Sequence, residues 1–200
     1  QANWHKIAFA AILLSQALVI HSWQDAKFGT ILNLLIFCVA FLAFAASNFQ
    51  ESYTRDVKKQ LNYRADQYMA LLTEQDIAHL PALVQRYLRH TGCIGKPRVQ
   101  SFRIEFSGRI RKNNETPWMP FTSEQYNVIE HPARLFFMQA VMNKLPVAGY
   151  HRFLYGKASM DIRLFSLYKV QAMKGNDMDV AETVTFFNDM CCLAPATLID

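Results

Sequence analysis

Two long runs of apolar residues open the sequence and form its strongest pattern, at residues 4–23 and 28–49. Each has about 20 residues, and a helix of that length, at ~1.5 Å per residue, spans the ~30 Å hydrocarbon core of a bilayer. The pattern therefore predicts a transmembrane helical hairpin over residues 4–49. The alternative is a hairpin buried inside a soluble protein, which would be unusual because both runs are apolar on every face.

Aromatic and polar residues within these runs refine the prediction. Trp4 and Trp23 bracket the first run, and tryptophan favours the boundary between water and lipid. Gln16 and Asn33 fall at similar depth when counted outward from the turn near Asp25. If they face each other, they can share an interhelical hydrogen bond. Otherwise each would point into a partner subunit or a groove free of lipid.

The charges beside the two runs predict an orientation in the membrane. Lys6 precedes the first run, and Arg55, Lys58, Lys59 and Arg64 follow the second. Because cytoplasmic flanks carry an excess of Lys and Arg, we expect both termini and the remaining chain to lie in the cytoplasm. The net charge of +5 suits contact with anionic lipid headgroups. Its basic residues are too dispersed for a nucleic-acid partner.

Helical patterns continue between residues 53 and 96, which we interpret as juxtamembrane and linking helices. Residues 53–72 are amphipathic, and a further helix begins at Thr73, where Asp76 completes a capping box. Another helix begins at Pro81 and has an apolar face made by Leu83, Val84, Tyr87 and Leu88.

After Pro97 the pattern changes to the period of two that is typical of strands. Strands are predicted at residues 102–111, 119–129, 134–142, 150–155, 158–164 and 168–173. A helix follows from Asp179, with Val180, Val184, Phe187 and Cys191 along one face. Successive strands without intervening helices indicate an antiparallel meander. The predicted fold class is α+β: the transmembrane hairpin, then helices, then a curved antiparallel sheet over residues 97–200 that is covered by helix.

The sequence carries no motif that declares a reaction. It has no phosphate-binding G-x-x-x-x-G-K-[ST], no G-x-G-x-x-G, no H-E-x-x-H, no C-x-x-C and no G-x-S-x-G. We therefore expect neither a metal nor a cofactor. Four titratable residues of the strands, Glu105, Glu124, Asp161 and His151, could act as acid and base only if the register of the sheet brought two of them together. The four cysteines do not form a disulfide framework, which agrees with a reducing compartment.

The strands are rich in aromatic residues and methionine, which could either line a site for an apolar ligand or pack against covering elements. The segment 134–142 is apolar on both faces and could line a cavity for an acyl chain. The candidate ligand residues are Phe102, Phe106, Phe136, Met138, Met142 and Phe153. Arg103 and Arg109 lie on a basic strand face that could meet the membrane surface. The pattern itself favours the plainer interpretation, in which helices cover one face of the sheet while the hairpin or bilayer covers the other.

Four segments resemble an uncharacterised bacterial family of membrane-anchored domains. They are WQDAKFGT at residues 23–30, the stretch from Leu80-Pro81 to Tyr87-Leu88-Arg89, WMPFT at 118–122 and PATL at 195–198. The resemblance implies a multi-pass protein of the bacterial inner membrane and brings no catalytic residues with it. It also implies that the domain continues past PATL with further strands, so we expect an incomplete sheet. The meander crossed by helices is similar, at the level of fold, to the half-barrel of lipoprotein carriers.

Three hypotheses for function follow. The leading one is a membrane-anchored, non-enzymatic domain that binds a lipid or other apolar ligand, or docks a partner, at the membrane surface. The second is a structural or interaction subunit of a membrane complex, contacting its partner through Gln16 and Asn33. The third is a membrane-bound hydrolase.

Overall fold

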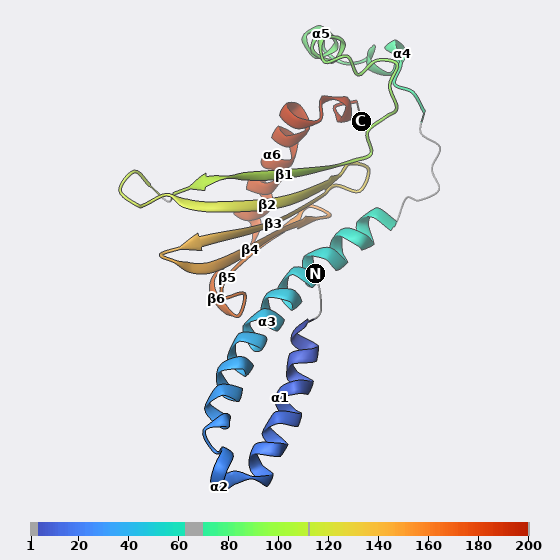
Figure 1. The fold of residues 1–200 in the computed structure, drawn as a ribbon. Helices are drawn as coiled ribbons and strands as arrows, with labels where there is room; N and C mark the ends of the chain where they lie inside the picture. Colours follow the sequence, from blue (N-terminus) through green and yellow to red (C-terminus); the bar gives the residue numbers. More distant parts are fainter. Residues whose placement is uncertain (1–3, 63–69, 112, 200) are drawn as a thin grey trace.

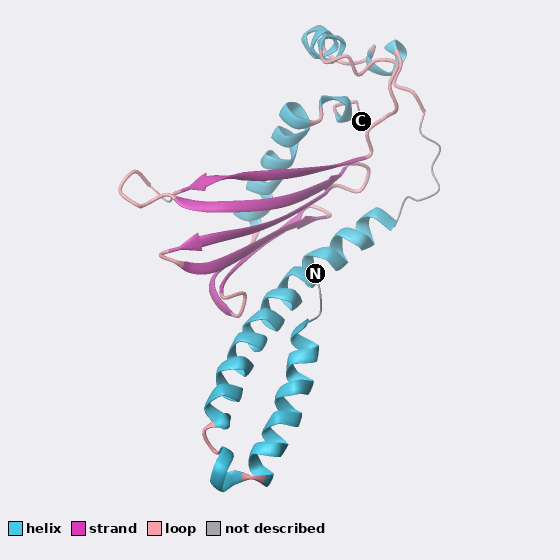
Figure 2. Ribbon diagram, in the orientation of Figure 1, coloured by secondary structure: helices cyan, strands magenta, loops and turns pink. Residues whose placement is uncertain are grey.

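A six-stranded antiparallel sheet is the centre of the structure, and helices lie on both of its faces (Figures 1 and 2). The computed structural model describes residues 4–62, 70–111 and 113–199. The helices are α1 (Trp4–His21), α2 (Trp23–Ala26), α3 (Gly29–Asn62), α4 (Glu74–Ile77), α5 (Ala82–His90), α6 (Asn176–Leu193) and the 3₁₀ turn η1 (Pro195–Thr197). The strands are β1 (Ser101–Ile110), β2 (Met119–Val128), β3 (Ala133–Met142), β4 (Leu145–Leu154), β5 (Lys157–Leu164) and β6 (Tyr168–Lys174).

The sheet is a meander in which each strand pairs with the next one along the chain. All five pairings are antiparallel, as expected when short turns connect successive strands. Together with the flanking helices, this order confirms the predicted α+β fold class. Each predicted strand is present, and five of the six have bounds within one or two residues of those predicted.

The exception is β4, which begins at Leu145 rather than at residue 150. The turn before it consists of Asn143 and Lys144, whose φ angles are 50° and 68°. Two successive residues with positive φ form the tight type of turn that matches the twist of a hairpin. Pro146, which argues against a strand in the sequence, lies beside Val141 near the start of β4, where proline is tolerated.

The alternation of side chains divides the sheet into an α3 face and an α6 face. In β3, Ala133, Leu135 and Phe137 are packed against α3, whereas Arg134 and Phe136 point to the opposite side, where α6 lies. Figure 1 shows the sheet between these two helices. The segment predicted to be apolar on both faces is thus a strand near the middle of the sheet with a helix on either side.

The N-terminal hairpin is closed by hydrogen bonds between polar side chains of α1 and α3. Ser15 Oγ donates to Asn33 Oδ1 at 3.0 Å, Asn33 Nδ2 donates to Gln16 Oε1 at 3.0 Å, and Gln16 Nε2 donates to the Thr30 hydroxyl at 3.1 Å. The bond predicted between Gln16 and Asn33 is present. Most other side chains of the hairpin remain exposed; the exposed fraction of Ile7 is 74%.

Helix α3 runs without a break through the predicted boundary near residues 49–53. Its first part belongs to the hairpin, and its last part lies along the sheet, where Phe49, Tyr53 and Val57 are buried. The Phe137 ring lies 5.6 Å from the ring of Phe49 and 5.4 Å from that of Tyr53, measured between centroids. The predicted juxtamembrane helix is therefore the end of α3, up to Asn62, and its predicted continuation over residues 63–69 lies outside the described residues.

Two reciprocal hydrogen bonds fix α3 against the sheet. Tyr53 of α3 donates to Glu124 Oε1 of β2, and Tyr150 of β4 donates to Asp56 Oδ2 of α3, both at 2.9 Å. Burial raises the pKa of both phenols, and the adjacent carboxylates raise it further, so each phenol keeps its proton. Because both bonds join elements far apart in sequence, they help to hold the hairpin and the sheet together.

Helices α4 and α5 form a small layer beyond the sheet, at the end of the molecule opposite α2 (Figure 1). The Asp76 carboxylate accepts hydrogen bonds from the backbone N–H and hydroxyl of Thr73, which confirms the predicted capping box. Leu72, Ile77 and Leu88 pack with Ile199, which follows η1. This cluster joins the α4–α5 layer to the end of α6.

Candidate functional site

Helix α6 turns polar residues toward the sheet. Asp179, Glu182 and Phe186 are its buried residues, with exposed fractions of 7–9%, and Asp189 is largely covered as well. Positions 179, 182, 186 and 189 recur at intervals of three and four, so they share one side of the helix. Three of these four inward positions are carboxylates, which is the reverse of an ordinary amphipathic packing.

Arg134 of β3 neutralises two of these carboxylates, Glu182 and Asp189, beneath α6, whereas Asp179 pairs with Lys157. Its Nε donates to Asp189 Oδ2 at 2.8 Å, its Nη1 to Glu182 Oε2 at 3.0 Å and its Nη2 to Gln125 Oε1 at 2.9 Å. Gln125 and Asn127 of β2 also donate to Asp189 Oδ2, at 2.7 and 3.2 Å. Buried charges need this degree of pairing and hydrogen bonding because unpaired they would carry a large desolvation cost.

His151 of β4 borders the same network. Its Nδ1 lies 3.4 Å from Glu182 Oε1. Burial acts to raise the pKa of Glu182, but His151 and Arg134 outweigh it and hold that pKa below its usual value. Glu182 is therefore an ionised carboxylate with two basic neighbours. Its contacts with Arg134 and His151 join α6 to strands β3 and β4.

The opposite side of α6 is apolar and faces outward. Val180, Val184 and Phe187 lie on it, with exposed fractions of 56%, 53% and 57%. These residues and Cys191 form the face that the sequence predicts for this helix. The spacing was predicted correctly, but the face points away from the sheet. The helix begins after Gly175, whose φ of 119° lies in a region that side chains disfavour.

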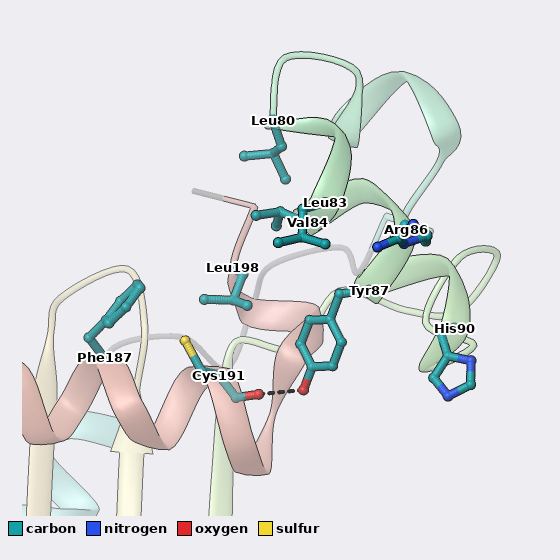
Figure 3. A pocket seen from close by; sticks show the side chains of 9 residues that line it. All are labelled: Leu80, Leu83, Val84, Arg86, Tyr87, His90, Phe187, Cys191 and Leu198. Carbon is teal, nitrogen blue, oxygen red and sulfur yellow. Dashed lines mark hydrogen bonds between the residues drawn. The ribbon is translucent and has the colours of Figure 1, made fainter.

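An apolar groove of about 750 Å³ lies where this outward face meets α5 (Figure 3). Its volume is within the range of small-molecule sites, ~300–1,000 Å³. Leu80, Leu83, Val84, Arg86, Tyr87 and His90 line it from the α4–α5 layer, and Phe187, Cys191 and Leu198 from the C-terminal segment. Tyr87 and Cys191 connect the two walls of the groove: the Tyr87 hydroxyl donates a hydrogen bond to the backbone oxygen of Cys191 at 2.6 Å.

Cys191 supplies the thiol that lines this groove. Burial raises the pKa of the Cys191 thiol, and the neighbouring Cys192 adds to this effect, so the thiol is protonated. Among the described residues, no group of three or more His, Cys, Asp or Glu side chains is placed to hold a metal ion. The groove offers apolar contact along most of its wall.

None of the six candidate ligand residues lines this groove; by register they lie on the α6 face of the sheet, and Phe106 also lines a pocket beside α3. Phe153 is buried with Phe186, and Phe102 packs against the same cluster. Phe136 lies between Arg134, whose guanidinium is 5.2 Å from its ring centroid, and His151. Phe106, Met138 and Met142 lie farther along the sheet; Phe106 and Met142 are each 37% exposed. Their role in binding remains a prediction.

A second, more polar pocket of about 460 Å³ lies beside α3 and brings two of the candidate acid–base residues together. Glu105 and Glu124 are directly opposite each other on β1 and β2, and both line the pocket. Arg103 forms ion pairs with both, and its Nε donates to Glu124 Oε2 at 3.0 Å. Because Tyr53 bonds the other oxygen of Glu124, this carboxylate already has a structural role.

The other predicted residues are dispersed. Asp161 pairs with Arg163 on β5, and His151 lies on the α6 face, so neither joins Glu105 and Glu124. Arg109 is exposed near the end of β1. In the hairpin, Trp4 and Trp23 are exposed by 46% and 53%.

Sequence reasoning missed the network under α6 and the groove. The apolar residues of α5 were predicted as a face of a linking helix, but their partner is a segment more than 90 residues away. Arg134 was counted as part of an apolar strand. A basic residue inside such a strand was the signal that could have pointed to buried carboxylates.

Comparison with curated proteins finds no match, and comparison with solved structures finds none either. The profile of one protein family matches residues 70–200, more than half of the chain, and that family is described as a family of unknown function, DUF6544. The match includes α4, α5, the whole sheet and α6, and therefore both walls of the groove. The chain thus belongs to the family of unknown function DUF6544.

Proposed function

We propose that this chain is a membrane-anchored protein whose DUF6544 domain binds a lipid or another apolar ligand in the groove between α5 and α6. The observation that carries this proposal is the outward apolar face of α6 where it meets α5. Phe187 and Leu83 line the groove with exposed fractions of 57% and 68%. Each side chain of this size gains ~1.5–3 kcal/mol when it is fully removed from water, so an apolar occupant would be stabilised there.

Membrane anchoring is supported by the exposure of the hairpin. Leu13, Leu18 and Phe28 are 70–73% exposed, so the chain itself does not cover them. Both α1 and α3 are long and apolar enough to cross a bilayer. Since α3 continues from the hairpin onto the sheet, a bilayer around the hairpin would hold the domain at its surface, in the bacterial inner membrane and on the cytoplasmic side.

Lipid retention by the purified full chain tests the proposal. The chain is reconstituted in nanodiscs, and bound lipid is measured by native mass spectrometry after release from the disc. We expect Phe187→Asp to reduce bound lipid strongly, because it places a charge inside the groove. Val180→Asp is the matched control, since Val180 lies on the same outward face with 56% exposure but does not line the groove. Equal retention by both variants would refute the groove as the site.

The interaction-subunit hypothesis loses its original motivation. Gln16 and Asn33 bond to each other within the hairpin, so neither needs a partner subunit to satisfy it. Crosslinking in membranes tests the remaining possibility of docking. A reproducible heterologous contact through the groove, together with an absence of bound lipid, would favour a partner over an apolar ligand.

The hydrolase, the third hypothesis from the sequence, becomes the second candidate because Glu105 and Glu124 share one pocket. A pair of carboxylates can divide the roles of acid and base when their surroundings differ. The test is a screen of the full chain against ester and glycoside substrates. Activity lost in both Glu105→Gln and Glu124→Gln, but retained in Asp161→Asn, would support this candidate; no activity in the parent chain would remove it.

A further inference from the structure

The groove between α5 and α6 has an apolar end and a basic end. Figure 3 shows Phe187, Leu198 and Leu80 on one side of Tyr87, and Arg86 and His90 on the other. We propose that the ligand of this groove is an anionic amphiphile, with its chain at the apolar end and its carboxylate or phosphate group at Arg86 and His90. This inference rests on the proposed function and specifies the chemical class of its ligand.

Arg86 is available for an anion, whereas the neighbouring arginine of α5 is not. Arg89 is held by the carboxylate of Glu74, with hydrogen bonds of 2.8 and 3.0 Å. Arg86 is exposed, lines the groove and has no ion pair or hydrogen bond to any residue that the structure describes. Guanidinium groups bind carboxylate and phosphate oxygens through paired hydrogen bonds.

His90 lies one helical turn after Arg86, so both side chains project from the same side of α5. It also lines the groove and is exposed. Its ring can donate a hydrogen bond to an anionic oxygen in either its neutral or its protonated form. The two residues therefore present donors at a single end of the groove.

Among the described residues, no carboxylate lines the groove beside Arg86 and His90. None of the lining residues is acidic, and α5 itself contains neither Asp nor Glu. Three carboxylates of α6 lie on the side of the helix that faces the sheet, away from the groove, and each is paired. Glu182 and Asp189 bind Arg134, and Asp179 binds Lys157. An anionic group would meet complementary charge at the groove, whereas a cationic group would meet like charge.

Photoactivatable amphiphiles test this inference. The full chain in phosphatidylcholine nanodiscs is exposed to three probes with the same sixteen-carbon diazirine chain, ending in a carboxylate, a phosphate or a neutral hydroxyl. Labelled residues are mapped by peptide mass spectrometry. We expect labels on α5 and α6, with the anionic probes exceeding the alcohol by about fivefold, the upper range for a solvent-exposed ion pair. The stronger of the two anionic probes distinguishes a fatty-acid carboxylate from a phosphate headgroup.

The combined variant Arg86→Gln/His90→Gln should lower labelling by the anionic probes to the level of the alcohol and leave the alcohol unchanged. Lys174→Gln removes an exposed cation from β6, outside the groove, and should change nothing. Equal labelling of the groove by all three probes would overturn the charge preference and leave the proposed function standing. An unaffected double variant would do the same. Absence of label from the groove with every probe would overturn both.

Discussion

The network beneath α6 makes Arg134 the residue whose loss should cost the domain most stability. Arg134→Met keeps a side chain of similar length but removes three hydrogen bonds, to Asp189, Glu182 and Gln125. The Arg134 side chain is 10% exposed, and those of Glu182 and Asp189 are 9% and 14% exposed. The substitution therefore leaves two carboxylates under the helix without their cation.

The expected cost follows from this burial. Removing one partner of a buried ion pair typically costs about 3–5 kcal/mol, because the remaining charge is neither solvated nor paired. For a chain of this size, each kcal/mol lowers the midpoint of thermal unfolding by ~2–4 °C, so Arg134→Met should lower it by about 6–20 °C. Replacing the whole network, by Arg134→Met with Glu182→Gln and Asp189→Asn, should recover much of that loss because neither carboxylate that Arg134 neutralised remains charged.

Thermal unfolding of the full chain in detergent, followed by circular dichroism, measures these effects. The control is Arg89→Met, which breaks an ion pair whose side chains are 48% and 58% exposed. Exposed pairs contribute about 0–1 kcal/mol, so this variant should change the midpoint little. If Arg134→Met cost no more than Arg89→Met, or if the triple variant were as unstable as Arg134→Met, the network would not be what holds α6 to the sheet.

Three further predictions concern pH, the α3 contact and the hairpin. The pKa of Glu182 is depressed in the folded chain, so its contribution is present above the ordinary value of 4.5 and is lost as pH falls through the folded value. Glu182→Gln should therefore flatten the fall in unfolding temperature below pH 4.5. The pKa of Tyr53 is raised, so its contribution is lost as pH rises above 10. Tyr53→Phe should cost ~0.5–1.5 kcal/mol at neutral pH and weaken the alkaline destabilisation seen in a pH titration of unfolding. Asn33→Leu should reduce the stability of the hairpin in detergent by about 0.6–2 kcal/mol, while Asn48→Leu, at an exposed position, should not.

Local patterns were enough to predict the elements of this chain. Alternation marked the strands, a capping box marked the start of α4, and the first apolar runs marked the hairpin, because these signals depend on neighbouring residues along the sequence. The start of β4 was missed because its turn is made by Asn143 and Lys144, and Asn-Lys is not a strong signal for positive φ.

The face that each element buries was decided by tertiary structure. The spacing of Val180, Val184 and Phe187 predicts an amphipathic α6, and amphipathic helices ordinarily turn that face inward. Here Arg134, which comes from a strand more than 40 residues earlier, pairs with Glu182 and Asp189 on the other face of the helix. The polar face of α6 is therefore turned to the sheet, and the apolar face is turned away from it. The sequence by itself determined where helices and strands form; only long-range pairing of charges decided that α6 would present its apolar side to α5 and so create the groove.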